Sequence, residues 1–435
     1  MTTTLSSHKK GLEVSAILSA AIDAVEPGQA IKQSVKRDGN NLICAEEKYN
    51  LNQYENIYLI AFGKAAVPMS VALAEILDDR LTGGWVVPKH TIRKIHPKLV
   101  VRSGSHPLPD EKSLQAGKLL LDAASSFTEN DLVFCLISGG GSALVTAPYD
   151  GISFQDIREL TRELLACGAR IDEINTIRRH LDRLKGGGLA RQIAPAKLVS
   201  LILSDVVNSP LEAIASGATA PDPSTLQDVW AILDKYQLLQ KTPITILDHF
   251  KKNLETPKPG DNLFFNVTNI LVGNNEIAAR SAIKTAQSFG FTCIDLGNAW
   301  QGEARELAED LCEKFLSTDE SPLCMIAGGE TTVTLQGTGI GGRNLELALA
   351  AVPLLDGIPN VMLVTLATDG EDGPTDAAGA VVTGDTANRA KNIGLDPRVF
   401  LNDNDSYHFF EKLGDLLKPG PTGTNVNDLT FLFRF

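Results

Sequence analysis

The stretch that decides the fold is Asp131-Leu-Val-Phe-Cys-Leu-Ile-Ser-Gly-Gly-Gly-Ser142, a strand-sized apolar run that ends in a triple glycine flanked by hydroxyls. Residues that favour a helix follow it. A glycine turn between a buried strand and a helix leaves backbone N–H groups pointing beyond the strand, and such a concavity suits phosphate. A turn that only reverses the chain is the alternative. We predict cofactor binding at Ser138, Gly139, Gly140, Gly141 and Ser142.

Apolar strand-like runs alternate with helix-like stretches on both sides of this segment, which is typical of α/β layers with a largely parallel sheet. The predicted strands are Asn56–Phe62, Gly84–Val87, Leu99–Arg102, Asp131–Ile137, Leu198–Ser204, Asn269–Gly273, Thr292–Asp295, Leu323–Ala327 and Val361–Ala367. The predicted helices are Val14–Val25, Ala65–Leu77, Leu114–Ser125, Phe154–Ala166, Ile171–Lys185, Glu276–Phe289, Gly302–Phe315 and Asn344–Leu355.

The chain has 435 residues, more than one hydrophobic core usually serves, so we expect two domains of unequal size. The stretch Lys241–Asp261 is rich in Pro, Lys and Asp and is the best candidate for the crossing between them. The expected domains are residues 1–262 and 263–435. At the end of the sequence, the apolar run Leu429–Phe435 suggests a terminal edge strand.

The net charge of -13 argues against nucleic acid or an anionic membrane as the main partner. The longest apolar runs are strand-sized, and the first residues lack the apolar core of a signal peptide, so a cytoplasmic protein fits best. The six cysteines form no CxxC pair, which favours reduced thiols over zinc. A homo-oligomer is compatible with the sequence.

Five loops share one layout, an apolar strand followed at once by glycine, hydroxyl or carboxylate residues. In open α/β sheets ligands bind beyond the carboxyl ends of the strands, so such loops tend to converge on one site. The loops are Ile60–Lys64, Leu136–Ser142, Ile202–Val206, Met325–Thr331 and Leu366–Asp372.

Two cations stand at predicted helix starts, Lys64 after a strand and Gly63, and Arg343 after the glycine-rich run Gly337–Gly342. A cation is locally unfavourable at a helix N-terminus, which suggests that an anion compensates each one. The alternative is a solvated surface charge. Three further cations are weaker candidates, because they could form the wet face of an amphipathic helix: Arg178, Arg179 and Lys185.

Carboxylates also gather at strand ends or in the adjacent loops. Phosphoryl transfer needs Mg²⁺ held by one or two carboxylates and by phosphate oxygens, and it needs a group that orients the attacking hydroxyl. Ordinary turn chemistry explains any single Asp in such loops, but explains the whole set poorly. The set is Asp205, Glu330, Asp369, Asp372 and Asp376, of which we assign Asp205, Asp369 and Asp372 to the metal.

No G-x-x-x-x-G-K-[ST] motif occurs, which excludes a P-loop. Gly337–Gly342 does match G-x-G-x-x-G and precedes a helix, but no acidic residue stands at the end of a second strand about 20 positions later. We therefore interpret the match as coincidental. The seven histidines are scattered, with no metal-ligand spacing and no paired nucleophile.

Taken together, these segments resemble the class II glycerate 2-kinases with a C-terminal domain of the MOFRL type. The resemblance runs over nearly the whole chain. It is carried by Gly-Lys-Ala-Ala at 63–66, Ser-Gly-Gly-Gly-Ser-Ala-Leu at 138–144, Ile-Asn-Thr-Ile-Arg-Arg-His-Leu at 174–181, Leu-Ser-Asp-Val at 203–206, Gly-Gly-Glu-Thr-Thr-Val at 328–333, Gly-Gly-Arg-Asn-Leu-Glu at 341–346 and Thr-Asp-Gly-Glu-Asp-Gly at 368–373.

The resemblance implies an N-terminal Rossmann-like three-layer sandwich, a smaller MOFRL-type α/β domain, and an active site in the cleft between them. It implies phosphorylation of D-glycerate to 2-phosphoglycerate with ATP and Mg²⁺. The lysine and arginine of the family's cleft match Lys64 and Arg343. Two alternatives stay open: an NAD(P)-dependent hydroxypyruvate reductase, which would use Gly337–Gly342 as its cofactor loop, and a non-catalytic nucleotide sensor.

Overall fold

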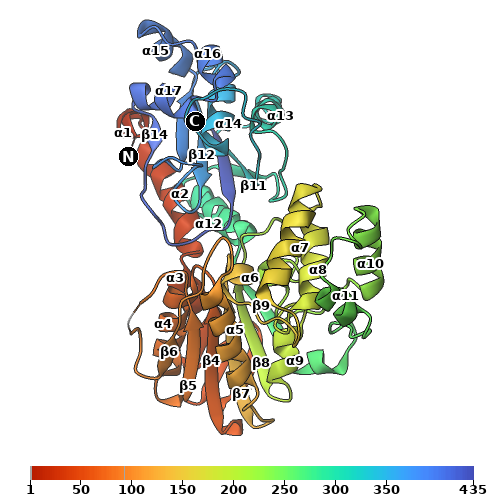
Figure 1. The fold of residues 1–435 in the computed structure, drawn as a ribbon. Coiled ribbons are helices and arrows are strands. Elements are labelled where there is room, and N and C mark those ends of the chain that lie inside the picture. Colours follow the sequence, from red (N-terminus) through yellow and green to blue (C-terminus); the bar gives the residue numbers. More distant parts are fainter. Residues whose placement is uncertain (1, 93) are drawn as a thin grey trace. The chain divides into compact units, whose positions relative to one another are not determined.

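A computed structural model describes residues 2–92 and 94–435. The chain forms two compact units, coloured along the sequence in Figure 1. The larger unit holds residues 30–92, 94–204 and 209–272, and the smaller unit holds residues 2–29, 205–208 and 273–435. The predicted crossing Lys241–Asp261 lies inside the larger unit. The domain boundary between residues 262 and 263 stays a prediction.

The larger unit is built on a six-stranded sheet with the order β6-β5-β4-β7-β8-β9. Its strands are β4 (Asn56–Phe62), β5 (Gly83–Val87), β6 (Leu99–Val101), β7 (Asp131–Ile137), β8 (Lys197–Leu203) and β9 (Val267–Gly273). The pairs β6/β5, β5/β4, β4/β7 and β7/β8 are parallel. Every residue of β7 is buried, as expected for a strand covered on both faces.

Helices cover both faces of this sheet, which gives the Rossmann-like three-layer sandwich. Helix α4 (Ala66–Leu77) leads from β4 to β5, whereas α5 (Glu111–Ala124) leads from β6 to β7 in the opposite direction along the sheet. Right-handed crossovers therefore put these two helices on opposite faces. In Figure 1, α5 lies in front of the strands.

The other helices of the larger unit include a group beside the sheet, visible in yellow and green in Figure 1. Leu164, Ile177, Val229 and Phe250 form its apolar core. The remaining helices are α3 (Pro27–Ser34), α6 (Gly141–Leu144), α7 (Phe154–Ala166), α8 (Ile171–Leu181), α9 (Gly188–Ile193), α10 (Leu226–Lys235) and α11 (Ile244–Phe250).

The larger unit also holds a small antiparallel sheet that the sequence patterns did not predict. It consists of β1 (Val35–Asp38), β2 (Asn41–Cys44) and β3 (Glu47–Asn50). These strands have four residues each and expose about half of them, so their apolar signal is too short to stand out.

The smaller unit is built on a mixed sheet with the order β10-β11-β15-β12-β13-β14. The strands are β10 (Thr292–Asp295), β11 (Leu323–Gly329), β12 (Val361–Ala367), β13 (Gly379–Thr383), β14 (Leu416–Leu417) and β15 (Asp428–Arg434). Strands β10 and β11 pair in parallel, whereas the pairs β11/β15, β15/β12, β12/β13 and β13/β14 are antiparallel. The expectation of a largely parallel sheet is therefore wrong for this unit.

Strand β15 lies in the middle of this sheet, paired with β11 on one side and β12 on the other. The prediction of an edge strand at Leu429–Phe435 was wrong. Phe431, Leu432 and Phe433 are all fully buried, and a continuous apolar run of this kind indicates a strand covered on both faces.

Helices cover both faces of the mixed sheet as well. Helix α12 (Asn275–Ser288) packs on β10 and β11, and α2 (Gly11–Ala24) packs on α12. On the other face, α13 (Ala304–Leu316) and α14 (Arg343–Ala351) share one apolar core with Leu432. The further helices are α1 (Thr3–Ser7), α15 (Thr386–Asn392), α16 (Pro397–Asn402) and α17 (Ser406–Leu413). None of the helices described is long and apolar enough to cross a membrane.

Candidate active site

The loops after β4 and β7 lie side by side, because the two strands are parallel neighbours with Phe62 opposite Ile137. The Lys64 N–H donates to the Gly139 carbonyl at 2.9 Å, and the Ala65 N–H donates to Ser138 Oγ at 3.0 Å. Ser138 is buried, so its hydroxyl fixes the start of α4. Two of the predicted loops therefore converge at one edge of the sheet.

The glycine loop after β7 leaves two N–H groups unused. Gly140 has φ 82°, and α6 begins at the next residue. Within residues 2–92 and 94–435, neither the Gly139 nor the Gly140 N–H donates a hydrogen bond. Ser142 Oγ lies 2.8 Å from Ser216 Oγ. Two unused donors beside a strand end are the arrangement that the sequence predicts for phosphate, and the assignment of a cofactor to this loop stays a prediction.

Lys64 is exposed at the N-terminal end of α4. The described part of the chain offers its ammonium group no ion pair or hydrogen bond. A methyl group built on Gly140 would lie 3.4 Å from Lys64 Cγ, so the lysine stem runs alongside the glycine loop. The prediction that an anion compensates Lys64 therefore stays a prediction.

His106 lies at the same loop, and the sequence analysis missed it. A methyl group built on Gly140 would lie 2.9 Å from His106 Cδ2 and 3.2 Å from its Nε2. Burial lowers the pKa of the imidazole, and the charges of Lys64 and Lys89 lower it further. The available signal was position: His106 stands shortly after β6, beyond the carboxyl end of that strand.

The three weaker candidate cations separate into two kinds. Lys185 is buried and pairs with Asp182 at 2.5 Å, and Arg179 is buried beside Asp222 at 3.0 Å. Each of these two cations therefore belongs to a buried ion pair and is not part of a solvated helix face. Arg178 has no ion pair or hydrogen bond among the residues described, and burial lowers the pKa of its guanidinium.

Arg343 opens α14 in the smaller unit and is held by two carboxylates. Its Nε lies 2.5 Å from Asp428 Oδ2, its Nη2 lies 3.3 Å from Asp428 Oδ1, and its Nη1 lies 3.0 Å from Glu330 Oε1. Burial lowers the pKa of the Arg343 guanidinium, but the charges of Asp428 and Glu330 outweigh burial and raise it overall. The protein itself thus supplies anions at this cation.

Asp372 caps the helix that Arg343 opens. Its Oδ2 accepts from the Leu345 N–H at 2.8 Å, and its Oδ1 accepts from the Asn344 N–H at 3.2 Å. A methyl group on Gly342 would lie 2.4 Å from Asp372 Cγ, so only glycine admits this contact. Burial raises the pKa of Asp372 to about 6, although these hydrogen bonds oppose the shift. Both carboxylate oxygens of Asp372 already accept hydrogen bonds from the protein. The predicted contact of Asp372 with a metal stays a prediction.

The other two predicted metal ligands lie in different surroundings. Asp369 follows β12, is half-buried, and makes only long contacts, 3.3 Å from the Glu371 N–H and 3.4 Å from Asn425 Nδ2. Asp205 follows β8 and lies in the segment 205–208, which belongs to the smaller unit.

A metal would need help from a bound ligand at these positions. No group of three or more His, Cys, Asp or Glu that could hold a metal ion occurs in the part of the chain that the structure describes. Mg²⁺ commonly takes only one or two carboxylates and completes its shell with water and phosphate oxygens. Asp369, with loosely engaged oxygens, fits that use, and its metal contact and that of Asp205 stay predictions.

The loop Gly337–Gly342 is already filled by the protein. The Thr338 N–H donates to Asp403 Oδ1 and the Ile340 N–H donates to Asp405 Oδ1, each at 3.0 Å. A methyl group on Gly339 would lie 2.4 Å from Asp405 Cβ. The glycines therefore allow close packing against residues 403–406, and two carboxylates occupy the place where a pyrophosphate would bind.

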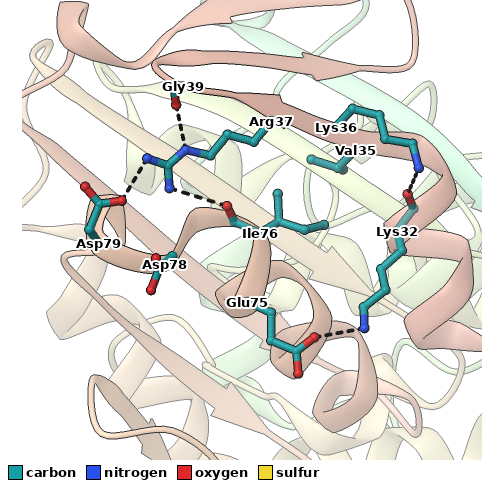
Figure 2. Close-up of a pocket in the computed structure, with 9 residues that line it drawn as sticks. All are labelled: Lys32, Val35, Lys36, Arg37, Gly39, Glu75, Ile76, Asp78 and Asp79. Carbon is teal, nitrogen blue, oxygen red and sulfur yellow. Dashed lines mark hydrogen bonds and ion pairs between the residues drawn. The ribbon is translucent and has the colours of Figure 1, made fainter.

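Figure 2 shows a separate open hollow of about 570 Å³ in the larger unit, between β1 and the end of α4. Four of its charged groups form two ion pairs, Lys32 with Glu75 at 2.8 Å and Arg37 with Asp79 at 2.7 Å, and Lys36 donates to the Lys32 carbonyl. None of the predicted site residues lines it. The glycine loop, Lys64 and Arg343 remain the candidates for chemistry.

Fold and loops together define an α/β protein in which the loops after β4 and β7 meet at the carboxyl ends of two neighbouring parallel strands. Two family models match the chain: "Domain of unknown function (DUF4147)" over residues 13–251 and "MOFRL family" over residues 323–428. The D-glycerate 2-kinase of Thermotoga maritima is 40% identical over 423 residues, which are 95% of each chain. The glycerate 2-kinase of Pyrococcus horikoshii is 38% identical over 95% of this chain and 94% of its own.

A solved structure agrees. The crystal structure of glycerate kinase from Thermotoga maritima matches with a TM-score of 0.88 at 38% identity, covering 98% of this chain and 100% of that one. The chain therefore belongs to the glycerate 2-kinase family with a MOFRL domain.

Proposed function

We propose that the protein is a glycerate 2-kinase that transfers the γ-phosphoryl group of ATP to the 2-hydroxyl of D-glycerate. The observation that carries the proposal is the unpaired Lys64 beside the two unused N–H donors of Gly139 and Gly140. An exposed cation with free backbone donors at a helix start suits a phosphate oxygen. Full-length similarity to named glycerate kinases supports the choice of substrate.

In the proposed reaction, the chain mainly positions charges. Phosphoryl transfer has little covalent chemistry for a protein to perform, so catalysis rests on alignment and on neutralising the phosphoryl oxygens. The N–H groups of Gly139 and Gly140 hold phosphate oxygens, and Lys64 neutralises the transferring group. Arg343, whose plane is fixed by Asp428, anchors the glycerate carboxylate through a guanidinium edge. The assignment of Lys64 and Arg343 to one reaction follows from the family resemblance.

Asp369, with Asp205, is the proposed holder of Mg²⁺. When bound, the metal would neutralise the phosphate charge that the protein's cations leave uncompensated. Glu330 is 43% exposed and lies 3.0 Å from Arg343, so it can accept a proton from a hydroxyl held at that arginine.

A cytoplasmic location stays a prediction from the sequence.

The reductase alternative is disfavoured by the same structure. It requires Gly337–Gly342 to bind a pyrophosphate with its backbone N–H groups, yet Asp403 and Asp405 accept from that loop. Two carboxylates in that place would repel the anionic cofactor.

One assay separates the two enzyme classes. The purified protein is given D-glycerate, ATP and Mg²⁺, and phosphorus NMR resolves 2-phosphoglycerate from 3-phosphoglycerate. A kinase gives 2-phosphoglycerate, loses activity in EDTA, and leaves NADH absorbance unchanged with hydroxypyruvate. NADH oxidation that is insensitive to EDTA and lost in Gly339→Val would overturn the proposal.

The role of Lys64 is tested within the same assay. Lys64→Ala should reduce kcat/KM by about 100- to 1000-fold, because a cation facing a transferring phosphoryl group is worth a few kcal/mol in the transition state. Lys118→Ala, on an exposed position of α5, serves as the matched control and should behave as wild type. Equal kinetics of the two variants would show that Lys64 is a solvated surface charge with no role in the reaction.

A further inference from the structure

His106 lies beside the glycine loop of the larger unit, and the proposed function gives it no role. Its ring faces the glycine loop, where Cδ2 lies 2.9 Å and Nε2 lies 3.2 Å from a methyl group built on Gly140. The same probe methyl lies 3.4 Å from Lys64 Cγ. Three segments that follow different strands therefore meet around the Cα of one glycine.

The surroundings of His106 are cationic and leave its ring nitrogens without a partner. Burial and the charges of Lys64 and Lys89 lower the pKa of the imidazole. Within residues 2–92 and 94–435, neither ring nitrogen makes a hydrogen bond or an ion pair. The half-buried imidazole therefore has no polar partner among the residues described. An anion beside the Gly140 loop would give the imidazole a hydrogen-bond partner and the Lys64 ammonium group a counter-charge.

We propose that His106 binds a substrate oxyanion at the Gly140 loop, with Nε2–H donating to the same anionic group that Lys64 contacts. The inference rests on the proposed function in that the oxyanion belongs either to the phosphates of ATP or to the carboxylate of glycerate. Its neutral form, favoured by burial and by the lysines, still carries one N–H donor. His106 thus adds a directional hydrogen bond where Lys64 adds charge.

Two substitutions separate the hydrogen bond from the mere presence of a ring. His106→Leu removes the donor and keeps an apolar side chain of similar size. His106→Gln keeps a neutral N–H donor that reaches as far as Nε2. His90→Leu is the matched control, because His90 is exposed on the stretch that follows β5. Circular dichroism checks that each variant is folded. If His106→Leu is not folded, His106→Asn replaces it, because the shorter asparagine amide cannot reach the anion.

Calorimetry with two probes identifies the source of the oxyanion. Inorganic tripolyphosphate stands for the phosphates of ATP, and D-glycerate supplies the carboxylate. We expect His106→Leu to weaken the binding of one probe about 10- to 100-fold, which is the range for a lost hydrogen bond to a charged group. His106→Gln should recover most of that loss, and His90→Leu should bind both probes as wild type does. The probe whose binding is weakened shows whether His106 contacts the phosphates of ATP or the carboxylate of glycerate.

The outcomes distinguish this inference from the proposed function. If tripolyphosphate binding depends on His106 but the protein makes no phosphoglycerate, the anion site stands and the kinase assignment fails. If both probes bind His106→Leu with wild-type affinity, or if neither binds the wild-type protein, the inference is overturned whatever the enzyme does. Equal weakening in the leucine and glutamine variants would also overturn it, because a hydrogen bond would then not be the cause.

Discussion

Arg343 is fixed in a plane by Asp428, which binds both Nε and Nη2. Lysine cannot reproduce such a two-pronged contact, because its ammonium group is a point charge. We expect Arg343→Lys to reduce kcat/KM by about 100-fold, and Asp428→Asn, which weakens the hold on a retained arginine, to reduce it by about 10-fold. Steady-state kinetics of both variants give the measurement.

A matched control for these variants is Arg280→Lys, in an exposed pair with Glu276 on α12. An exposed pair of this kind contributes little, so the control should keep wild-type kinetics. An Arg343→Lys enzyme as active as the control would show that charge alone matters at Arg343.

Asp372 makes stability depend on pH in an unusual direction. Its pKa in the folded protein is about 6, against an ordinary value of 3.8, so between these pH values the folded state binds more protons than the unfolded state. The free energy of unfolding therefore falls as pH rises from about 4 to about 6. A shift of this size corresponds to roughly 3 kcal/mol for the group.

The measurement for Asp372 is a difference between two proteins. Urea unfolding of wild type and of Asp372→Asn at pH 4 and pH 7 should show that the substitution removes this fall in stability, since asparagine still accepts from the Leu345 N–H but does not titrate. Asp122→Asn, on the exposed side of α5, should leave the pH dependence unchanged. Identical slopes for wild type and Asp372→Asn would contradict the assignment.

At the level of elements, the glycine loop between β7 and α6 is predicted to be the most sensitive turn. Gly140→Val adds a side chain that meets the His106 ring at 2.9 Å, at φ 82° where valine is strained. We expect ATP binding to weaken at least 100-fold by calorimetry. Gly168→Val is the control for strain alone, because Gly168 has φ 73° and nothing within 4 Å of an added methyl. Normal ATP affinity in Gly140→Val would contradict the phosphate-loop assignment.

The sequence predicted most long elements, because their apolar patterns are strong. Asp131–Ile137 and Val361–Ala367 match β7 and β12 to the residue, and Phe154–Ala166 matches α7. Fully buried strands appear as unbroken apolar runs, and α7 has a clear apolar stripe. The order of strands in the sheet could not be predicted in this way. The apolar pattern of Leu429–Phe435 indicates a strand but not which strands lie beside it.

The site was predictable only in part, for a similar reason. Lys64 and the loop Ser138–Ser142 follow strands directly, and that position is visible in the sequence. The anions that hold Arg343 were not visible, because Asp428 is 85 residues away along the chain. His106 gave no metal spacing and no nucleophile partner. Residues that act through tertiary contacts leave no local pattern.

At the level of the whole molecule, the smaller unit depends on a segment from the beginning of the sequence. Helix α2 packs on α12 and buries Val14, Ile17 and Leu18 completely or nearly so. Burial of three such side chains is worth roughly 5 to 9 kcal/mol, comparable with the entire stability of many domains. We predict that a fragment of residues 273–435 lacks fixed tertiary structure on its own, as judged by near-ultraviolet circular dichroism.

Adding residues 2–29 as a separate peptide should restore the tertiary signal of that fragment. The control peptide carries Ile17→Lys, which places a charge at a fully buried position and should not restore it. A fragment that folds fully without the peptide would show that α2 is dispensable for this unit.

The central place of β15 also has a consequence for biosynthesis. Strands β11 and β12 flank β15 and have no ladder with each other, so the sheet keeps a gap until Asp428–Arg434 fills it. On the ribosome, the larger unit has all its strands once residue 273 has emerged, whereas the smaller unit lacks its central strand until residues 428–434 have emerged. Until then, the edges of β11 and β12 that face β15 are unpaired and can form hydrogen bonds with strands of other chains. The nascent protein should therefore need protection by a chaperone late in translation, and a ribosome that stalls before Asp428 should release an aggregation-prone product.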